Sequence, residues 1–170
     1  MQKNILDGVN LLHEKVKKLF QQIIENGTEE ELHVLEHVLE GLDKKEHSYI
    51  NRLLHMDYEI TEEGLEIKIP LHPMVNNPLK ILHGGITATV IDTAMGALVH
   101  HLLPNDKAGV TTQLTINYIA PGIGDDIICK ARISHHGSKT MLVNADVLRS
   151  DGQKIAQATG SFFIIDRKKT

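Results

Sequence analysis

The sequence predicts an α+β fold behind an N-terminal helical extension. The first third of the chain repeats apolar residues at helical spacing, whereas the remainder contains one long apolar segment followed by several alternating ones. A single apolar helix beside a run of antiparallel strands is the pattern of an α+β fold. We therefore expect a helical extension in residues 1–54 and one sheet-and-helix domain in residues 55–170.

The extension begins with an amphipathic helix over residues 4–25. Asn26-Gly27 ends this helix, and Thr28 with Glu31 is the capping-box pattern that begins a second one. The second helix either continues or restarts between Lys44 and Leu54. We expect an ordinary packed extension in preference to a separate binding module. The inward apolar residues are Ile5, Val9, Leu12, Val16, Leu19, Phe20 and Ile23 in the first helix, and Leu32, Leu35, Val38, Leu39 and Leu42 in the second.

The second helix also carries His33, Glu36 and His37 in the order His-x-x-Glu-His, which is the inverted form of a zinc-protease motif. Two histidines four residues apart could share a metal ion. No third ligand is identified, and the neighbouring residues are polar or acidic. We expect a solvated helix face and no metal site.

The domain that follows is predicted to begin with a β-hairpin and a buried helix. Residues 58–60 and 65–69 alternate around a turn, and residues 70–82 are irregular. Residues 85–103 are small or apolar on nearly all sides, so this helix should be buried. Asp151-Gly152 is a tight hairpin turn between the last two strands. The predicted later strands are residues 109–119, 126–135, 139–150 and 153–165, giving a sheet of five or six strands.

Composition excludes several classes of protein. A net charge of −4 and a pI near 6.2 give no basic field for nucleic acid or an anionic membrane. The only cysteine, Cys129, rules out an internal disulfide framework, and its strand context indicates a packing residue. No signal-peptide pattern and no segment near the ~20 apolar residues of a membrane span is present. We expect a cytoplasmic protein.

His83-Gly84-Gly85 followed by Asp92 is the candidate active-site motif. A helix beginning at the glycines would direct its N–H groups and the positive end of its dipole toward a ligand. Asp92 follows Gly85 by seven residues, which is close to two turns, so both should share one helix face. A lone carboxylate on a packed face is costly unless it is hydrogen-bonded or has a use. The alternative is a solvated aspartate on an exposed side.

This motif, with Asn77-Pro78 upstream, resembles the hotdog-fold acyl-CoA thioesterases, and most closely their phenylacetyl-CoA (PaaI-like) branch. Residues 109–121, 137–140 and 151–160 resemble the later strands of that family, and the resemblance covers about residues 56–166. It implies a hotdog fold, in which an antiparallel sheet wraps around a central helix. It also implies hydrolysis of an acyl-CoA with no cofactor beyond the CoA of the substrate.

The expected chemistry assigns a role to each candidate residue. The backbone N–H of Gly85 can stabilise an oxyanion, and Asp92 can act as general base or as nucleophile. The resemblance further implies that Asn77 polarises the carbonyl or holds the water, that Thr111 positions the water, and that His83 shapes the turn. It implies a site that spans a homodimer, which assembles further to a tetramer.

The segment Gly137, Ser138 and Lys139 is a candidate contact for the CoA phosphates, because a glycine turn with a lysine suits an anion. A plain hairpin turn explains it equally well.

Two other functions stay open. One is a non-catalytic acyl-CoA or lipid-binding hotdog protein with the N-terminal helices as its partner interface. The other is a hotdog dehydratase, although His100 and His101 lie too far from Asp92 in sequence for that spacing.

Overall fold

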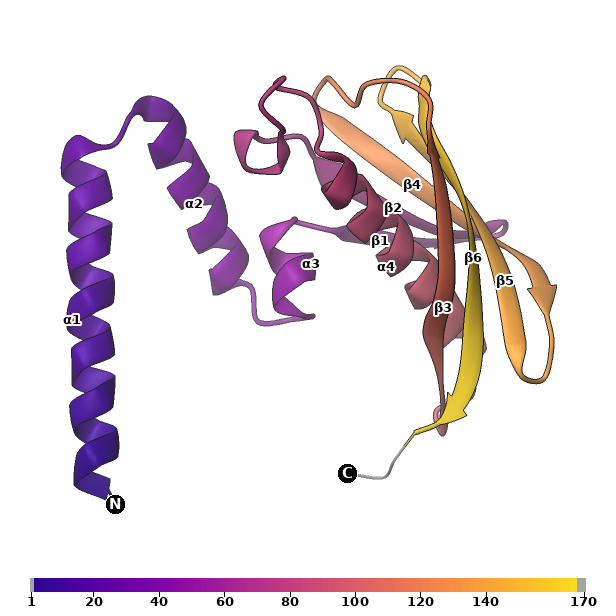
Figure 1. The fold of residues 1–170 in the computed structure, drawn as a ribbon, viewed down its shortest axis with the longest axis horizontal. Coiled ribbons are helices and arrows are strands. Elements are labelled where there is room, and N and C mark those ends of the chain that lie inside the picture. The colour runs from indigo at the N-terminus through magenta and orange to yellow at the C-terminus, as the bar shows by residue number, and fades with distance from the viewer. Residues whose placement is uncertain (1, 168–170) are drawn as a thin grey trace. The chain divides into compact units, whose positions relative to one another are not determined.

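The chain forms two compact units, residues 1–46 and residues 47–170. The computed structural model describes residues 2–167, with side chains described for residues 9–167. The first unit contains α1 (Gln2–Asn26) and α2 (Glu29–Asp43), and the second contains one sheet and its helix (Figure 1). The predicted α+β class with N-terminal helices is confirmed. The proposed domain boundary after residue 54 stays a prediction.

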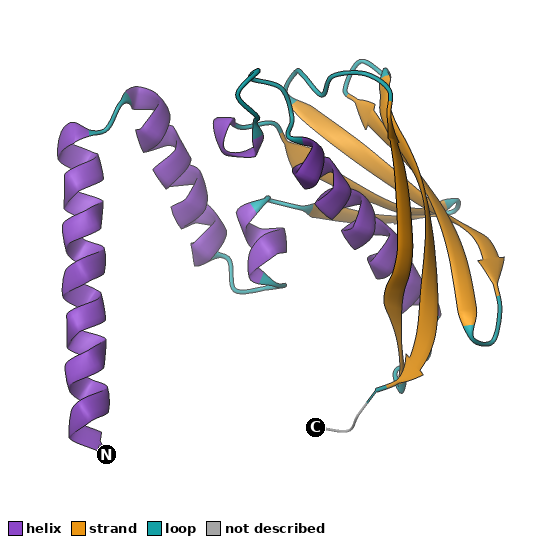
Figure 2. Cartoon of the chain, viewed as in Figure 1, coloured by secondary structure: helices purple, strands orange, loops and turns teal. Residues whose placement is uncertain are grey.

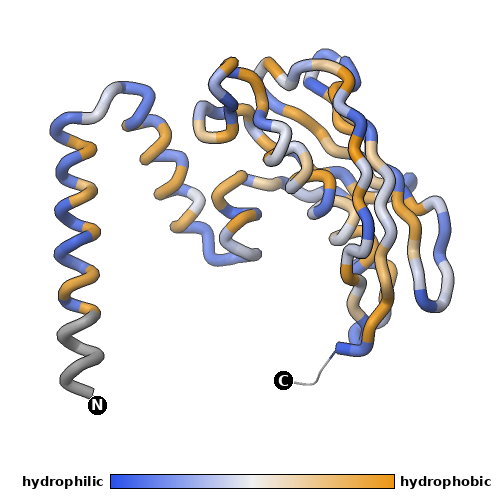
Figure 3. The backbone as a smooth tube through the Cα atoms, in the orientation of Figure 1, coloured by the Kyte–Doolittle hydropathy of each residue, from blue (hydrophilic) through white to orange (hydrophobic). Residues whose placement is uncertain are grey.

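The first unit follows the predicted helices closely. The Thr28 hydroxyl accepts a hydrogen bond from the Glu31 N–H at 3.3 Å, and the Glu31 carboxylate accepts one from the Thr28 N–H at 2.7 Å, which completes the capping box. After α2 the chain restarts as the short helix α3 (Tyr49–Leu53). Figure 3 shows apolar positions repeating along α1 and α2. The side chain of Ile5, expected in that stripe, lies outside the described residues.

The solvated face expected for α2 is wrong at His37, which is only 7% exposed, whereas His33 is open to solvent. His37 lies one turn before the buried Gly41 and so shares its covered side. No group of three or more potential metal ligands occurs in the part of the chain that the structure describes.

The sheet of the second unit has six strands, all paired antiparallel, in the order β1-β2-β4-β5-β6-β3 (Figure 2). β1 and β3 are therefore the two edges. The Asp151-Gly152 turn between β5 and β6 forms as predicted, with Gly152 at φ +84°. The strands are β1 (Asp57–Thr61), β2 (Gly64–Pro70), β3 (Lys107–Tyr118), β4 (Asp126–His136), β5 (Thr140–Arg149) and β6 (Lys154–Asp166).

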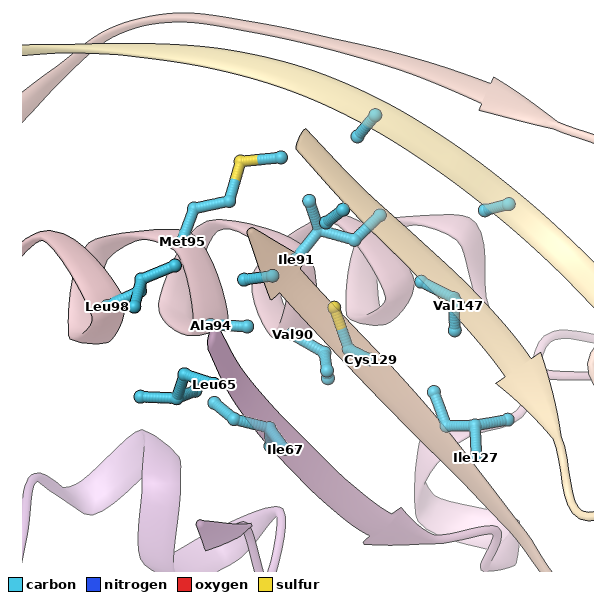
Figure 4. Packing of buried hydrophobic residues seen from close by; sticks show 14 of the residues in the cluster. Leu65, Ile67, Val90, Ile91, Ala94, Met95, Leu98, Ile127, Cys129 and Val147 are labelled. Atoms are coloured by element: carbon cyan, nitrogen blue, oxygen red, sulfur yellow. The ribbon is translucent and has the colours of Figure 1, made fainter. Parts of the chain in front are cut away.

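The helix α4 (Gly84–Leu102) lies in the curve of this sheet (Figure 1). One of its sides is buried, and Figure 4 shows Val90, Ile91 and Met95 packed among residues of the sheet. Its other side is only half-buried and carries small or polar residues, among them Ala88 and Asp92. The expectation that α4 is buried on nearly all sides is therefore wrong for a single chain. A helix side made of small residues looks like a buried side in the sequence, although here this side of α4 faces away from the sheet.

Two expectations from composition can be compared with the structure. Cys129 is fully buried in the core, where burial raises the pKa of its thiol to about 12, so it packs as predicted. None of the helices among the described residues combines the length and hydropathy that crossing a bilayer requires.

Candidate active site

Asp92 and Thr111 form a polar pair between α4 and β3. The Thr111 hydroxyl donates a hydrogen bond to Asp92 Oδ1 at 2.9 Å. The pairing of β3 with β6 shifts register between Thr111 and Gln113. Such a bulge turns side chains away from the regular alternation and is frequent beside active sites. The half-buried carboxylate is thus oriented by a neutral donor, with its second oxygen left as a proton acceptor.

This pair lines a hollow of about 660 Å³ in the second unit. A volume of about 300–1,000 Å³ suits a small-molecule ligand. The ring of His47 stacks on Tyr58 with 5.4 Å between centroids, and both rings contribute to the wall. Sequence reasoning missed these residues because they lie at the start of the second unit, well before the His83–Asp92 motif. The wall also includes Asn51, Ile60, Gly96, His100, His101 and Phe162.

His100 lies on the same side of α4 as Asp92, eight residues further along. Its Nε2 accepts a hydrogen bond from the Gly109 N–H at 3.3 Å. Burial, together with the positive charge of Arg167, lowers the pKa of His100 below 6.5. Both effects favour the neutral imidazole. The spacing of Asp92, Gly96 and His100 at four-residue intervals was the sequence signal that could have placed His100 here.

The first turn of α4 is fixed by side chains that bind its backbone. His83 is the N-cap, and its Nδ1 accepts a hydrogen bond from the Gly85 N–H at 2.9 Å. The Tyr118 hydroxyl donates to the Gly84 carbonyl at 2.8 Å, a contact that the sequence did not reveal. Neither glycine has a positive φ, so their contribution is the absence of a side chain on the surface of this turn. The predicted oxyanion donor, Gly85 N–H, is occupied here by the exposed His83 ring.

Asn77 stabilises the loop that precedes α4. Its Oδ1 accepts a hydrogen bond from the Leu79 N–H at 2.8 Å, so its amide NH₂ is the group that can point to a ligand. Asn77 and Gly84 line a second hollow, of about 410 Å³, together with Tyr118 and Gly122. Of the predicted candidates, Asp92 and Thr111 therefore line the first hollow and Asn77 the second, whereas His83 and Gly85 line neither.

The division follows from the geometry of α4. Gly85 and Asp92 are separated by seven residues, which places them ~10 Å apart along the helix axis. Reacting atoms must come within about 3–3.5 Å of each other. The N–H of Gly85 and the carboxylate of Asp92 in one chain therefore lie too far apart to act on the same carbonyl. A shared helix face, as predicted, does not make a shared site.

The candidate CoA contact lies in the hairpin between β4 and β5. The register aligns Thr111 with Phe162 and Phe162 with Met141, so this hairpin stands at the Thr111 end of the sheet. Two strand spacings separate it from Thr111, or about 10 Å. A side chain on Gly137 would meet His135 Nε2 at 2.9 Å and the Thr140 carbonyl at 3.0 Å, so packing alone explains this glycine. The role of Ser138 and the exposed Lys139 stays a prediction.

Comparisons with known proteins agree with this architecture. Residues 79–156 match the family model described as "Thioesterase superfamily". "Putative esterase VNG_1336C" of Halobacterium salinarum is 33% identical over 121 residues, which cover 64% of this chain and 80% of that protein. "Medium/long-chain acyl-CoA thioesterase YigI" of Escherichia coli is 25% identical over 134 residues, covering 69% of this chain and 86% of that protein.

Solved structures give the same result. The BH2602 protein of Bacillus halodurans, whose crystal structure contains CoA, is 36% identical with a TM-score of 0.79, covering 84% of this chain and 98% of that one. The hotdog arrangement, a six-stranded antiparallel sheet around a central helix, is thereby confirmed. Membership of the PaaI-like branch stays a prediction. The chain belongs to the thioesterase superfamily and is an enzyme of that family.

Proposed function

We propose that this enzyme hydrolyses acyl-CoA thioesters to a free acid and CoA. The observation that carries the proposal is the half-buried Asp92 carboxylate, oriented by the Thr111 hydroxyl at the wall of a ligand-sized hollow. The Escherichia coli relative named as an acyl-CoA thioesterase and the CoA-containing Bacillus halodurans structure support this substrate class.

The chemistry adds water across the carbon–sulfur bond. Asp92 removes a proton from the water that attacks the thioester carbon, or attacks that carbon itself to form an anhydride that water then cleaves. Thr111 fixes the carboxylate for either step. The acyl carbon receives the hydroxyl group, and the sulfur leaves as CoA and takes a proton.

The negative charge that develops on the carbonyl oxygen requires hydrogen-bond donors. The first N–H groups of a helix have no partner within the helix and lie at the positive end of its dipole. At α4 this turn contains Gly85, and the exposed His83 ring would rotate away from the Gly85 N–H as the oxygen binds. The amide of Asn77 is a further donor for the same oxygen or for the water.

The active site is assembled from two copies of the chain, because Gly85 and Asp92 of one chain lie too far apart. β3 is an edge strand that offers unpaired backbone groups to a second copy. β3 carries Thr111 at the hollow that Asp92 lines and Tyr118 at the second hollow, which Gly84 lines. Antiparallel pairing of two β3 strands centred near Leu114 would set Thr111 of each chain opposite Tyr118 of the other. Assembly beyond this dimer to a tetramer remains an expectation.

A thiol-release assay over a panel of acyl-CoA substrates tests the proposal. We expect free CoA and the free acid in equal amounts from at least one substrate, and loss of both products with Asp92→Asn. Tight binding of acyl-CoA without release would instead support a non-catalytic binding protein. Hydration of an enoyl-CoA with its thioester intact would support a dehydratase. A preference for phenylacetyl-CoA would place the enzyme in the PaaI-like branch.

The hairpin is proposed to bind the CoA phosphates through Lys139. Lys139→Gln should raise KM for acyl-CoA and leave KM for a short thioester without phosphates unchanged. Lys80→Gln, a change at another exposed lysine, is the matched control and should alter neither constant.

A further inference from the structure

The apolar side chains of α1 are exposed to solvent over most of the length of the helix. Leu12, Val16 and Leu19 are 58%, 55% and 51% exposed. The grooves between α1 and α2 are lined on the α1 side only by residues near its C-terminal end, including Phe20 and Ile23. α2 therefore covers the end of the stripe next to the turn and leaves the preceding turns of α1 uncovered.

The exposed residues follow a heptad repeat. From Val9 to Ile23 the spacing alternates between three and four residues, as in the a and d positions of a coiled coil. The a positions are β-branched, with Val9, Val16 and Ile23, and the d positions are Leu12 and Leu19. β-branched residues at a with leucine at d favour parallel two-stranded coiled coils. Two further exposed apolar residues, Leu11 and Ile24, lie outside this seam at c and b positions.

The residues beside the seam are compatible with a second α1. In a parallel pair the g position of one helix faces the following e position of the other, so Lys15 of one copy would face Phe20 of the second. Its methylene groups can cover the ring while its charge stays in water. This arrangement creates no repulsion between like charges.

The neighbouring helix makes an anionic lipid surface a poor partner. α2 has six acidic residues and no lysine or arginine between Glu29 and Asp43. Such a helix is repelled by negatively charged lipid, whereas a basic face is typical of helices that lie on membranes. α1 itself carries Lys15, Lys17 and Lys18, so the preference for a protein helix rests on the heptad repeat of its seam together with the acidic charge of α2.

We propose that α1 pairs, in parallel and in register, with α1 of a second copy of this chain. The pairing uses the open part of the seam, Val9, Leu12, Val16 and Leu19, and ends where α2 covers Ile23. It goes beyond the proposed thioester hydrolysis, because α1 belongs to the first unit and the active-site residues belong to the second.

Disulfide cross-linking of the full-length chain tests the pairing. Leu12→Cys places a thiol at a d position, where the two copies would approach closely enough for the Cα separation of about 4.4–6.8 Å that a disulfide needs. Glu14→Cys, on the opposite side of α1, is the matched control, and the native Cys129 is buried. We expect an interchain disulfide with Leu12→Cys at least tenfold more abundant than with Glu14→Cys. Equal cross-linking of the two variants would overturn the proposal.

A second pair of variants separates seam packing from accidental proximity. Adding Leu19→Glu to Leu12→Cys should abolish the cross-link, whereas adding Gln21→Glu, with the same charge change off the seam, should preserve it. Cross-linking that survives both additions would contradict pairing through the seam. Failure to cross-link, combined with flotation on vesicles of phosphatidylcholine and phosphatidylglycerol, would show that the seam binds lipid and would also overturn the proposal. Thiol release, measured on every variant, reports the proposed hydrolysis independently of the pairing.

Discussion

The two functional segments of α4 are fixed in opposite ways. At its first turn, side chains bind the backbone: His83 accepts from the Gly85 N–H, and Tyr118 donates to the Gly84 carbonyl. At Asp92, a side chain is bound by another side chain, the Thr111 hydroxyl. The first turn therefore offers backbone donors that suit developing negative charge, and the second segment offers a proton acceptor. In the proposed reaction, each segment supplies one half of the chemistry that a thioester requires.

The rigid spacing of the two segments is the reason for proposing that the oxyanion donor and the acid of one site come from different chains. A helix fixes Gly85 and Asp92 ~10 Å apart along its axis, and no change of side-chain rotamer brings a backbone N–H closer. The small residues on the half-buried side of α4, among them Ala88 and Gly96, allow a second chain to approach this side closely. The comparison thus supports the proposal that the site is shared between subunits.

The largest effect is expected from Asp92→Asn. The amide keeps the shape of the side chain and still accepts from Thr111, but it no longer takes a proton. We expect kcat for thiol release to fall by about 100-fold or more, the usual size of a general-base contribution. Asp106→Asn, at an exposed loop acid, should leave kcat within about twofold. Near-normal turnover of a folded Asp92→Asn enzyme would remove Asp92 from the mechanism.

Gly85→Val tests the other segment. The first atom of the new side chain would lie 3.1 Å from His83 Nδ1, and the β-branched side chain would cover the turn that the substrate oxygen must approach. Loss of one oxyanion donor typically costs about 100-fold or more in kcat. Because Gly85 is exposed, folding should be preserved, and Gly85→Ala should give a smaller loss. Normal hydrolysis by Gly85→Val would place the oxyanion site elsewhere.

Thr111 provides a finer test of the acid segment. Thr111→Val keeps the shape and removes the hydrogen bond to Asp92, which is worth about 1 kcal/mol and hence about fivefold in kcat. Thr111→Ser keeps the hydroxyl and should retain most of the activity. If both variants lose activity equally, the methyl group of Thr111 matters more than its hydroxyl.

The smallest effect is expected at His100, whose pKa is lowered by burial and by Arg167. The folded chain keeps this imidazole neutral at pH values where the unfolded chain is already protonated. His100 should therefore have no effect on the pH dependence of stability above about pH 6.5 and should reduce stability as the pH falls below it. In urea unfolding at pH 7.5 and pH 5.5, His100→Gln should lose less stability on acidification than the wild type. An equal loss in both would contradict this.

Sequence reasoning predicted the helices and strands well because each obeys one period. The capping box at Thr28 and the turn at Gly152 are local patterns and form as expected. Burial of α4 on nearly all sides was wrong, because small residues look the same whether they face a core or an open side. His83 was expected to shape this turn, and it does so through its hydrogen bond from Gly85. The partner Tyr118 for Gly84 was missed, since it depends on where a distant strand ends in space.

Mixing two inactive variants tests most directly whether one chain supplies the acid and the other the oxyanion donor. Asp92→Asn chains and Gly85→Val chains are unfolded together, refolded, and separated into homodimers and heterodimers by distinct affinity tags. A heterodimer then holds one site with both changes and one site with neither. We predict that its activity recovers to about half that of the wild-type dimer, while both homodimers stay inactive. Heterodimers of confirmed mass that remain inactive would contradict the account and would mean that each site is built within a single chain.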